Sequence, residues 1–520
     1  MTSIGLVELG LAESGRVGHS RTVAAFASWV ALLCGLTGCP INDLQKGTDR
    51  PDSSANTTGP TIRDGSLAGE ASTDALQPAD DDAQQADGDD ATPGDAGVGA
   101  PSDGAPEGPS ADGSSGTVYY SLDDPSRWTF FSASAVANGI TKYSGAVFDG
   151  RYLYFVPQFN PPNVLRYDTQ GGFTEPAAWT YYTPVPAIVA AGGSVAGSYT
   201  YLGGAFDGRY VYLAPFGTNT YAVRYDTQQP FSHDSSWSVF NAATVDPAAN
   251  YWGVISDGRY AYFIPNKTTK VLAYDNTSGG DGGAGFTSAA SFTSYDLGTG
   301  NLGYWGGAFD GTYVYLAPYS GSVAARHDTA LPITAGWDVG AAGFDFNNNF
   351  LLGTAAHFWG GAFDGSRVYM IPNTTQSWTL VSYSTAGQFA DYGAWSECAL
   401  GTQLFSGTTS GQSFVGAAFD GKRLFLAPYG SPAGDSGAAP LPIVTYDTTQ
   451  PLCPTAIATA YSKFDPTSVD GGPTGTGFEG AVFDGHYVYF VPHAGNVVAR
   501  FEAKSVNSGL SPPSYKGSWW

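Results

Sequence analysis

The 520-residue sequence contains few of the residues that form many common sites, with 4 cysteines, 6 histidines and 2 methionines. Its 22 lysines and arginines are outnumbered by 46 aspartates and glutamates, which gives a net charge of −24. Proteins that bind nucleic acid need a basic surface, so we expect no nucleic-acid partner. The histidines do not recur at a metal-ligand spacing, and the sequence has neither a phosphate-cradling loop nor a Gly-x-Ser-x-Gly motif. We therefore predict no metal site, no cofactor and no assigned catalytic residue.

Long apolar runs are also missing. Val23–Leu36 is too short to span a bilayer, which takes about 20 apolar residues. Because Arg16 and Arg21 precede it and small residues follow it, residues 1–39 fit an export signal. Its end, Leu-Thr-Gly-Cys, resembles the lipobox of bacterial lipoproteins. The resemblance implies that Cys39 becomes the lipidated first residue and that the protein is anchored to the cell envelope, without distinguishing the inner from the outer membrane.

The next segment, residues 40–117, has no aromatic residue and is rich in Asp, Ala, Gly, Ser and Pro. Its 16 acidic and 3 basic residues give a net charge of −13. Such a segment cannot bury enough apolar surface to offset the entropy of ordering, so we predict a disordered, extended tether. Cys398 and Cys453 lie in the part that would be exported, where disulfides can persist. Their spacing in the sequence does not decide whether the two form a disulfide.

The dominant pattern is a phrase that occurs seven times, in which a Gly-rich run ends in Asp-Gly and a run rich in Tyr, Val and Leu follows. Its aspartates are Asp149, Asp207, Asp257, Asp310, Asp364, Asp420 and Asp484. Repetition near 50 residues is typical of supersecondary units that bury their apolar faces against one another. Asp-Gly between two strand-forming runs predicts a hairpin in which both turn residues have positive φ. We attribute these carboxylates to turn geometry and not to metal binding or catalysis.

Each unit contains two further strand-forming runs, and no helical periodicity is evident. Residues 201–240 show the pattern, with the hairpin, then Ala222–Tyr225, then Ser236–Phe240. Four antiparallel strands in each of seven units predict an all-β fold, a seven-bladed β-propeller over residues 118–503 with a tail at 504–520. The last unit lacks a fourth strand, while an unassigned strand surrounds Trp128. We predict that this N-terminal strand completes the last blade, in the sheet that contains Tyr487.

The repeats resemble kelch repeats. The resemblance rests on a Tyr-Asp pair at the end of the third strand and a tryptophan in the fourth, and it covers residues 118 to about 503. The pairs begin at Tyr167, Tyr225, Tyr274 and Tyr446, and the tryptophans are Trp179, Trp237, Trp337 and Trp395. These repeats have Ala-Pro, Val-Pro or Ile-Pro where kelch blades have Gly-Gly after the second strand. The resemblance implies four-stranded blades.

Aromatic residues gather where each inner strand begins, on the face opposite the Asp-Gly turns. Adjacent residues on a strand point to opposite sides, so one of each pair packs between blades while the other can face the axis. Exposed aromatic planes there would suit a sugar ring or an apolar peptide side chain. The alternative is that all of them are core. The candidate binding residues are Tyr201, Tyr251, Trp252, Tyr304, Trp305, His357, Phe358 and Trp359.

We therefore predict a lipid-anchored propeller that recognises an envelope protein or glycan without catalysis. One alternative is a polysaccharide-acting hydrolase or lyase, which would need two carboxylates converging within about 5–10 Å. Another is a structural envelope component whose two faces bind nothing. The fold alone does not choose among them, and the sequence leaves the oligomeric state open.

Overall fold

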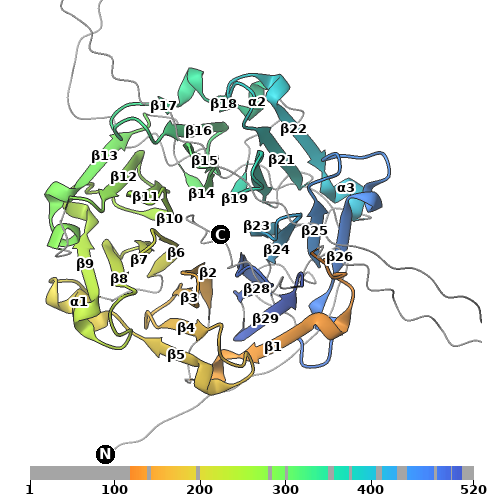
Figure 1. Ribbon diagram of the computed structural model, residues 1–520. Coiled ribbons are helices and arrows are strands. Elements are labelled where there is room, and N and C mark those ends of the chain that lie inside the picture. Colours follow the sequence, from red (N-terminus) through yellow and green to blue (C-terminus); the bar gives the residue numbers. More distant parts are fainter. Residues whose placement is uncertain are drawn as a thin grey trace, which may run out of the picture. The chain divides into compact units, whose positions relative to one another are not determined.

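A computed structural model gives the arrangement of the chain (Figure 1). The residues that the structure describes are 117–136, 142–194, 200–278, 284–298, 303–349, 357–373, 378–405, 413–429, 442–473, 477–493 and 495–505. The predicted export signal with Cys39, the tether up to residue 116 and the tail from residue 506 lie outside them. Among the described residues, no helix is long and apolar enough to cross a membrane.

Seven antiparallel sheets surround one axis, and the innermost strand of each sheet comes first in its blade (Figure 1). The predicted seven-bladed β-propeller is therefore confirmed. Blades 1 to 3 are β2 (Tyr143–Phe148), β3 (Tyr152–Pro157), β4 (Val164–Asp168) and β5 (Trp179–Tyr182); β6 (Tyr201–Phe206), β7 (Tyr210–Pro215), β8 (Tyr221–Asp226) and β9 (Trp237–Asn241); β10 (Tyr251–Ser256), β11 (Tyr260–Pro265), β12 (Lys270–Asp275) and β13 (Phe292–Asp296).

Blade 4 differs because its outer edge is split between two short strands that both pair with the third strand. Blades 4 to 6 are β14 (Tyr304–Phe309), β15 (Tyr313–Pro318), β16 (Val323–Asp328), β17 (Trp337–Asp338) and β18 (Phe344–Asp345); β19 (Phe358–Phe363), β20 (Arg367–Pro372), β21 (Thr379–Ser384) and β22 (Trp395–Ala399); β23 (Ser413–Phe419), β24 (Arg423–Tyr429), β25 (Ile443–Asp447) and β26 (Tyr461–Phe464). Within the described ranges, three short α-helices, which the sequence pattern did not predict, lie in connections alongside several 3-10 turns: α1 (Val185–Ala190), α2 (Phe346–Asn349) and α3 (Leu400–Leu404).

The N-terminal strand closes the ring, as predicted. Blade 7 consists of β27 (Phe478–Phe483), β28 (Tyr487–Pro492), β29 (Val497–Glu502) and β1 (Trp128–Ser132). Trp128 is paired with Phe501 in the register of β1 and β29, and β27 packs against β2 of blade 1. Tyr119 forms an isolated bridge with Lys504, whose backbone N–H donates to His486 O beside the last Asp-Gly turn. The chain therefore enters the propeller on the Asp-Gly face.

The Asp-Gly turns are built differently from the prediction. Only the glycine has positive φ, for example 93° at Gly258, whereas none of the seven aspartates does. The aspartate instead caps the turn with its side chain. In blade 3, Asp257 Oδ1 accepts hydrogen bonds from the backbone N–H groups of Arg259 (2.8 Å) and Tyr260 (2.6 Å).

The second carboxylate oxygen holds a buried tyrosine five residues further along the chain. Tyr262 Oη donates to Asp257 Oδ2 at 2.8 Å. Five further blades repeat this bond in the pairs Asp149–Tyr154, Asp207–Tyr212, Asp310–Tyr315, Asp364–Tyr369 and Asp484–Tyr489. In blade 6, Phe425 stands where the tyrosine would be, and Arg423 Nε donates to Asp420 Oδ2 at 3.0 Å instead. The recurring aspartates thus serve blade structure, as the sequence analysis inferred, through more bonds than the turn alone requires.

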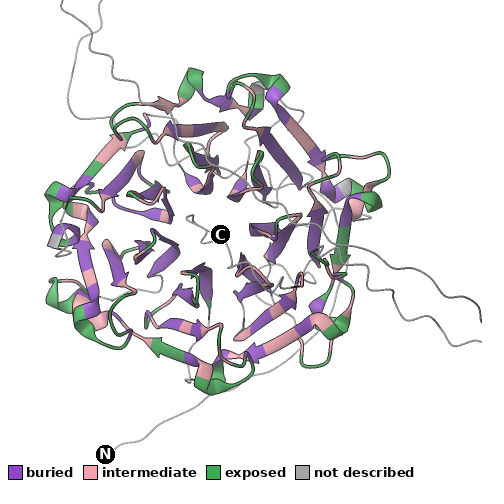
Figure 2. Ribbon diagram, in the orientation of Figure 1, coloured by how far each residue is buried: buried purple, intermediate pink, exposed green. Residues whose placement is uncertain are grey.

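The outer half of each blade is fastened by an aromatic pair. An aromatic side chain near the end of the third strand contacts the ring of the first residue of the fourth, as Tyr225 does with Trp237 at 4.7 Å between ring centroids. Where the fourth strand begins with tryptophan, the indole N–H donates to a backbone carbonyl in the preceding loop, in this blade that of Phe231 at 3.0 Å. Figure 2 shows that buried residues lie mainly in the inner and middle strands of each blade, whereas exposed residues concentrate in the loops at the outer rim.

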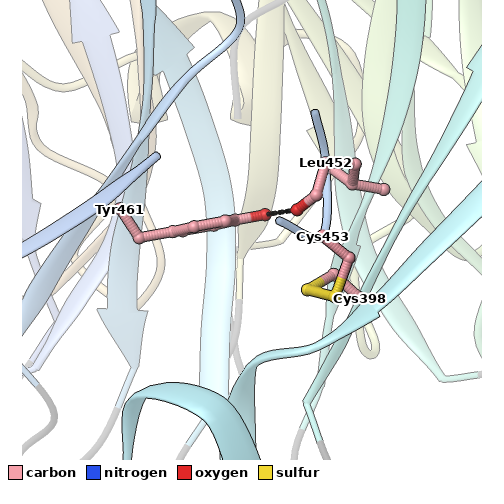
Figure 3. Close-up of a disulfide and its surroundings, with 4 residues drawn as sticks. All are labelled: Cys398, Leu452, Cys453 and Tyr461. Carbon is pink, nitrogen blue, oxygen red and sulfur yellow. Dashed lines mark hydrogen bonds between the residues drawn. A yellow bond between two sulfur atoms is a disulfide. The ribbon is translucent and has the colours of Figure 1, made fainter. Parts of the chain in front are cut away.

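Cys398 of β22 and Cys453 of the following blade form a disulfide, with their Cα atoms 5.0 Å apart (Figure 3). Beside it, Tyr461 Oη donates to the backbone carbonyl of Leu452 at 2.7 Å. The bridge therefore joins the outer parts of blades 5 and 6.

Candidate functional site

The inner strands begin with a conserved arrangement of backbone in all seven blades. In six blades the first residue of the inner strand is paired with the proline that ends the second strand, and in blade 6 the second residue, Phe414, is paired with Pro428; in all seven a β-bulge follows, as between Tyr251 and Val254. Gly253 occupies this bulge with a φ of 103°, a conformation that residues with a side chain rarely adopt. The bulge ends the regular pairing at the strand entry and fixes which way the neighbouring side chains point.

The first aromatic residue of each entry belongs to the core. Tyr201, Tyr251, Tyr304 and Phe358 are at most 2 % exposed and pack in the clusters between blades. These four candidate residues therefore cannot present a ring to a ligand, because strand alternation turns them between the blades. For them the core alternative holds.

The second residue of each entry points toward the axis. Trp252 of blade 3 and Trp359 of blade 5 have ring centroids 6.5 Å apart, although blade 4 lies between their strands. Side chains from non-adjacent blades approach this closely only near the centre of the ring. The equivalent residues in the other blades are Ser144, Leu202, Trp305, Val415 and Glu479. Three consecutive blades thus supply tryptophans, while blades 7 and 1 supply polar groups.

The tryptophans stack on one another. Trp305 lies between Trp252 (3.7 Å between centroids, 6° between planes) and Tyr319 (3.5 Å, 7°). Phe216 contacts Trp252 edge-on, and Trp359 lies 4.9 Å from Trp305. We call Phe216, Trp252, Trp305, Tyr319 and Trp359 the aromatic ladder. Because both faces of Trp305 are covered by its neighbours, this residue can offer a ligand its edge but not its ring plane.

The ladder continues into a polar group on the opposite side of the ring. Tyr429 contacts Trp359 edge-on at 4.6 Å and His493 at 4.5 Å. His493 Nδ1 is hydrogen-bonded to Glu479 Oε2, and Glu479 Oε1 accepts from Gln158 Nε2 at 3.2 Å. We call Gln158, Glu479 and His493 the polar triad, and the ladder, Tyr429 and the triad together the axial cluster.

The polar triad is deeply placed. Gln158 is 4 % exposed, Glu479 2 % and His493 9 %. Taking a carboxylate out of water is costly unless its oxygens are bonded, and here both oxygens of Glu479 have partners from the chain. The pair holds the imidazole in one orientation.

Several buried polar atoms beside the axis have no hydrogen-bond partner among the described residues. They include Ser144 Oγ, Gln158 Oε1, Trp305 Nε1, His357 Nδ1, Trp359 Nε1 and Ser413 Oγ. Buried polar atoms in folded proteins are nearly always bonded to protein, water or a ligand. Their gathering at one end of the axis marks this end as the place where a bound molecule would be hydrogen-bonded.

His357 lies at the edge of the ladder. Its ring is 5.2 Å from that of Tyr319, at 68° between planes, and it is half-buried. Burial raises the pKa of Tyr319, so its hydroxyl stays protonated near neutral pH and can donate a hydrogen bond. Of the eight candidate binding residues, Trp252, Trp305, Trp359 and His357 are thus the ones that line the axial cluster.

Sequence reasoning missed the polar triad. Glu479 occupies the same strand position as the three tryptophans, so alignment of the seven inner strands would have placed it near the axis. Its bond to Gln158 crosses 321 residues and could not be read from spacing. No group of three or more His, Cys, Asp or Glu residues that could hold a metal ion occurs in the described part of the chain.

A cavity of about 750 Å³ lies on the outer rim, between α1 and β9. Small aliphatic side chains such as Ala187 and Ala190 line much of it, together with Trp237 and Val239. It is far from the axis, and the aromatic and ionisable groups of the axial cluster make that cluster the stronger candidate site.

The strand order and ring closure define a seven-bladed β-propeller with an aromatic and polar cluster at one end of its axis. Comparison with solved structures finds matches at low identity. A catalytically inactive virginiamycin B lyase from Staphylococcus aureus, solved with quinupristin, is 12 % identical over 72 % of this chain and 98 % of its own, with a TM-score of 0.47. YCF48 from Cyanidioschyzon merolae is 11 % identical over 72 % and 98 %, with a TM-score of 0.44.

The β-propeller domain of Cps50 (Swd1) from Myceliophteria thermophila is 9 % identical over 70 % of this chain and 97 % of its own, with a TM-score of 0.40. These likenesses carry no argument about function. No protein-family model and no curated protein matches the sequence.

Proposed function

We propose that this protein is a recognition module of the bacterial cell envelope, which binds an envelope glycan or protein at the axial cluster without catalysing a reaction. The observation that carries the proposal is the aromatic ladder, in which Trp252, Trp305 and Trp359 from three blades meet beside the axis while remaining partly accessible. The tryptophans that begin outer strands, such as Trp237, donate an indole hydrogen bond to a backbone carbonyl, whereas Trp305 Nε1 has no partner among the described residues. Aromatic side chains with unused donors are typical of binding sites.

The placement of the chain's entry supports display on a tether. Val118 and Tyr119 lie on the Asp-Gly face, and the axial cluster lies at the opposite ends of the inner strands. A tether of residues 40–117 on a lipidated Cys39 would therefore join the propeller on the face that does not carry the axial cluster. We also propose that the repeats are kelch-like, since the tyrosine of the third strand and the tryptophan of the fourth are in contact, as in Tyr167–Trp179 at 4.5 Å.

A second candidate is an enzyme that acts on a polysaccharide. The observation that favours it is the pair of His493 and Glu479, because an imidazole oriented by a carboxylate is the arrangement of a general base. The axial cluster contains one carboxylate, that of Glu479, whereas the usual glycosidase mechanism needs two. We therefore favour binding without turnover.

The test is a pull-down from envelope extracts together with a glycan array, both with the full-length chain and its Trp252→Ala variant. We expect retention of a ligand by the natural chain and its loss in the variant, with unchanged melting temperature. Tyr181→Ala is the matched control, since Tyr181 is an exposed aromatic residue of β5, the outermost strand of blade 1. Binding that survives Trp252→Ala, or consumption of a polysaccharide by the natural chain, would reject the proposal. Anchoring is tested separately, by loss of membrane association and of acyl labelling in Cys39→Ser.

A further inference from the structure

We propose that the ligand of the axial cluster is an uncharged saccharide, hydrogen-bonded by Gln158 of the polar triad, by Ser144 and by the indole N–H of Trp305; this rests on the proposed recognition function and names its ligand class.

The hydrogen-bonding groups at this end of the axis are of both kinds. Gln158 Oε1 accepts, Trp305 Nε1 donates, and the hydroxyl of Ser144 does either; none of these atoms has a partner among the described residues. Gln158 and Ser144 are 4 % and 0 % exposed, so their unpartnered atoms are not simply solvated at the surface. A sugar hydroxyl, which donates one hydrogen bond and accepts others, satisfies neighbouring donors and acceptors together.

The same cluster offers apolar surface alongside the polar groups. Trp252, Trp305 and Tyr319 are stacked in parallel planes, so they present a row of ring edges with Trp359 beside it. A saccharide has this double character, with C–H groups on its ring faces and hydroxyls around its rim. An apolar ligand would leave Gln158 Oε1, Ser144 Oγ and Trp305 Nε1 unpaired, and an unpaired buried polar group is unfavourable.

Charge argues against ionic ligands. Glu479 is 2 % exposed, and its two oxygens are hydrogen-bonded to Gln158 and to His493, so its carboxylate is screened from an ammonium group. The axial cluster contains no lysine or arginine, and residues 118–520 have 28 acidic and 17 basic residues, which gives a net charge of −11. Acidic polysaccharides would be repelled by such a chain. The class that remains is neutral.

The experiment measures binding of neutral and acidic oligosaccharide panels to the full-length chain by calorimetry and by tryptophan fluorescence. Two variants remove single groups and keep shape. Trp305→Phe retains a ring between Trp252 and Tyr319 but lacks the N–H donor, and Glu479→Gln retains the size of the side chain but not its charge. The matched control is Trp337→Phe on the outer strand β17, where the indole N–H donates to Ile333 O at 2.8 Å.

We expect at least one neutral oligosaccharide to bind, and its dissociation constant to rise about 10-fold or more in Trp305→Phe and in Glu479→Gln. Trp337→Phe should bind like the natural chain. Affinities within twofold of the natural chain in both test variants would overturn the inference, as would preference for the acidic panel. Retention of an envelope protein without binding of any neutral saccharide would overturn this inference alone. Absence of every ligand would overturn the proposed function as well.

Discussion

Arg500 of blade 7 lies over the ring of Phe173 of blade 1, with the guanidinium carbon 4.2 Å from the ring centroid. The same guanidinium is 4.1 Å from the ring of Tyr487 on the neighbouring strand of its own blade. It is therefore held between two aromatic rings that belong to the first and last blades. This contact joins the ends of the ring in addition to the closing strand β1.

The contact between an arginine and a phenylalanine of the next blade recurs at some interfaces between blades and is replaced at the others. Arginine and phenylalanine meet across three further interfaces, in the pairs Arg166–Phe231, Arg224–Phe286 and Arg326–Phe389. The other three interfaces have neither residue. Their third strands have Ala273, Ser382 and Thr445 in place of arginine, and the next blades have the aliphatic residues Ile333, Leu452 and Leu122, in the same order, in place of phenylalanine. The interface that joins Ser382 and Leu452 is the one bridged by Cys398 and Cys453. Each interface thus has a matched pair, and the pairs differ between interfaces.

The first prediction concerns the coupling of Arg166 and Phe231. In a double-mutant cycle with Arg166→Ala and Phe231→Leu, we expect a coupling energy of about 0.5–2 kcal/mol, because a cation partly removed from water interacts strongly with an aromatic face. Urea unfolding of the four proteins measures it. The same cycle between Arg259→Ala and Phe231→Leu is the control, since Arg259 pairs with Asp275 in another blade. Coupling equal to that of the control would contradict the assignment.

The second prediction concerns the aspartate of the turn. Asp257→Ala should lower the free energy of unfolding by about 1–3 kcal/mol, because it leaves the hydroxyl of Tyr262, a fully buried residue, without its acceptor. Adding Tyr262→Phe should recover part of the loss, as blade 6 suggests with Phe425 at the equivalent position. Chemical unfolding is the measurement. If adding Tyr262→Phe lowered the stability of Asp257→Ala by as much as it lowers that of the natural chain, loss of the Asp257–Tyr262 bond would not explain the effect of Asp257→Ala.

The third prediction concerns acid. Hydrogen bonding to Arg151 lowers the pKa of Asp168 below its usual value. A carboxylate whose pKa is depressed in the folded state stabilises the protein above its unfolded pKa, and this stabilisation is lost as the pH falls through the folded pKa. Between about pH 5 and about pH 2.5, the natural chain should therefore lose slightly more melting temperature than Arg151→Gln, by at most about 2 °C because the pair is partly exposed. An identical pH profile for the two proteins would contradict this prediction.

The fourth prediction concerns the disulfide. Replacing Cys398 and Cys453 by serine removes a link between residues 55 positions apart and should cost about 2–4 kcal/mol. A reducing agent should lower the melting temperature of the natural chain and leave the serine variant unaffected. If reduction freed both thiols of the natural chain without lowering its melting temperature, the disulfide would have no stabilising role.

The fifth prediction concerns ring closure. Trp128 is 6 % exposed, packs against Phe501 with 4.9 Å between ring centroids and lies in the strand that completes blade 7. Trp128→Ala should cost about 3–5 kcal/mol and promote association through the open edge of β29. Trp337→Ala in blade 4 is the control, because Trp337 is only half-buried and its strand closes no ring. Light scattering measures association, and thermal unfolding measures stability. Equal effects of Trp128→Ala and Trp337→Ala would mean that ring closure contributes no stability beyond the burial of the side chain.

Much of the fold could be read from the sequence because its determinants are local. The spacing of Asp-Gly turns gave the number of blades, since each turn needs only its own residues and a glycine with positive φ. The strand around Trp128 could be assigned to the last blade because the last repeat lacked a fourth strand and an exposed third strand would invite aggregation. The second hydrogen bond of these aspartates was not predicted, because it joins the carboxylate to a tyrosine hydroxyl on the following strand and not to the turn itself, as in Asp257–Tyr262.

The axial cluster is different because its contacts join residues that are distant in sequence. Alternation along a strand predicted that one residue of each aromatic pair would face the axis, and Trp252, Trp305 and Trp359 do so. The sequence alone determined a ring of seven similar blades, since hairpins and strand patterns act over a few residues. Only the tertiary structure decided that Trp305 is covered on both faces and that Glu479 meets His493 and Gln158, because packing around a closed ring brings together side chains that no local rule relates.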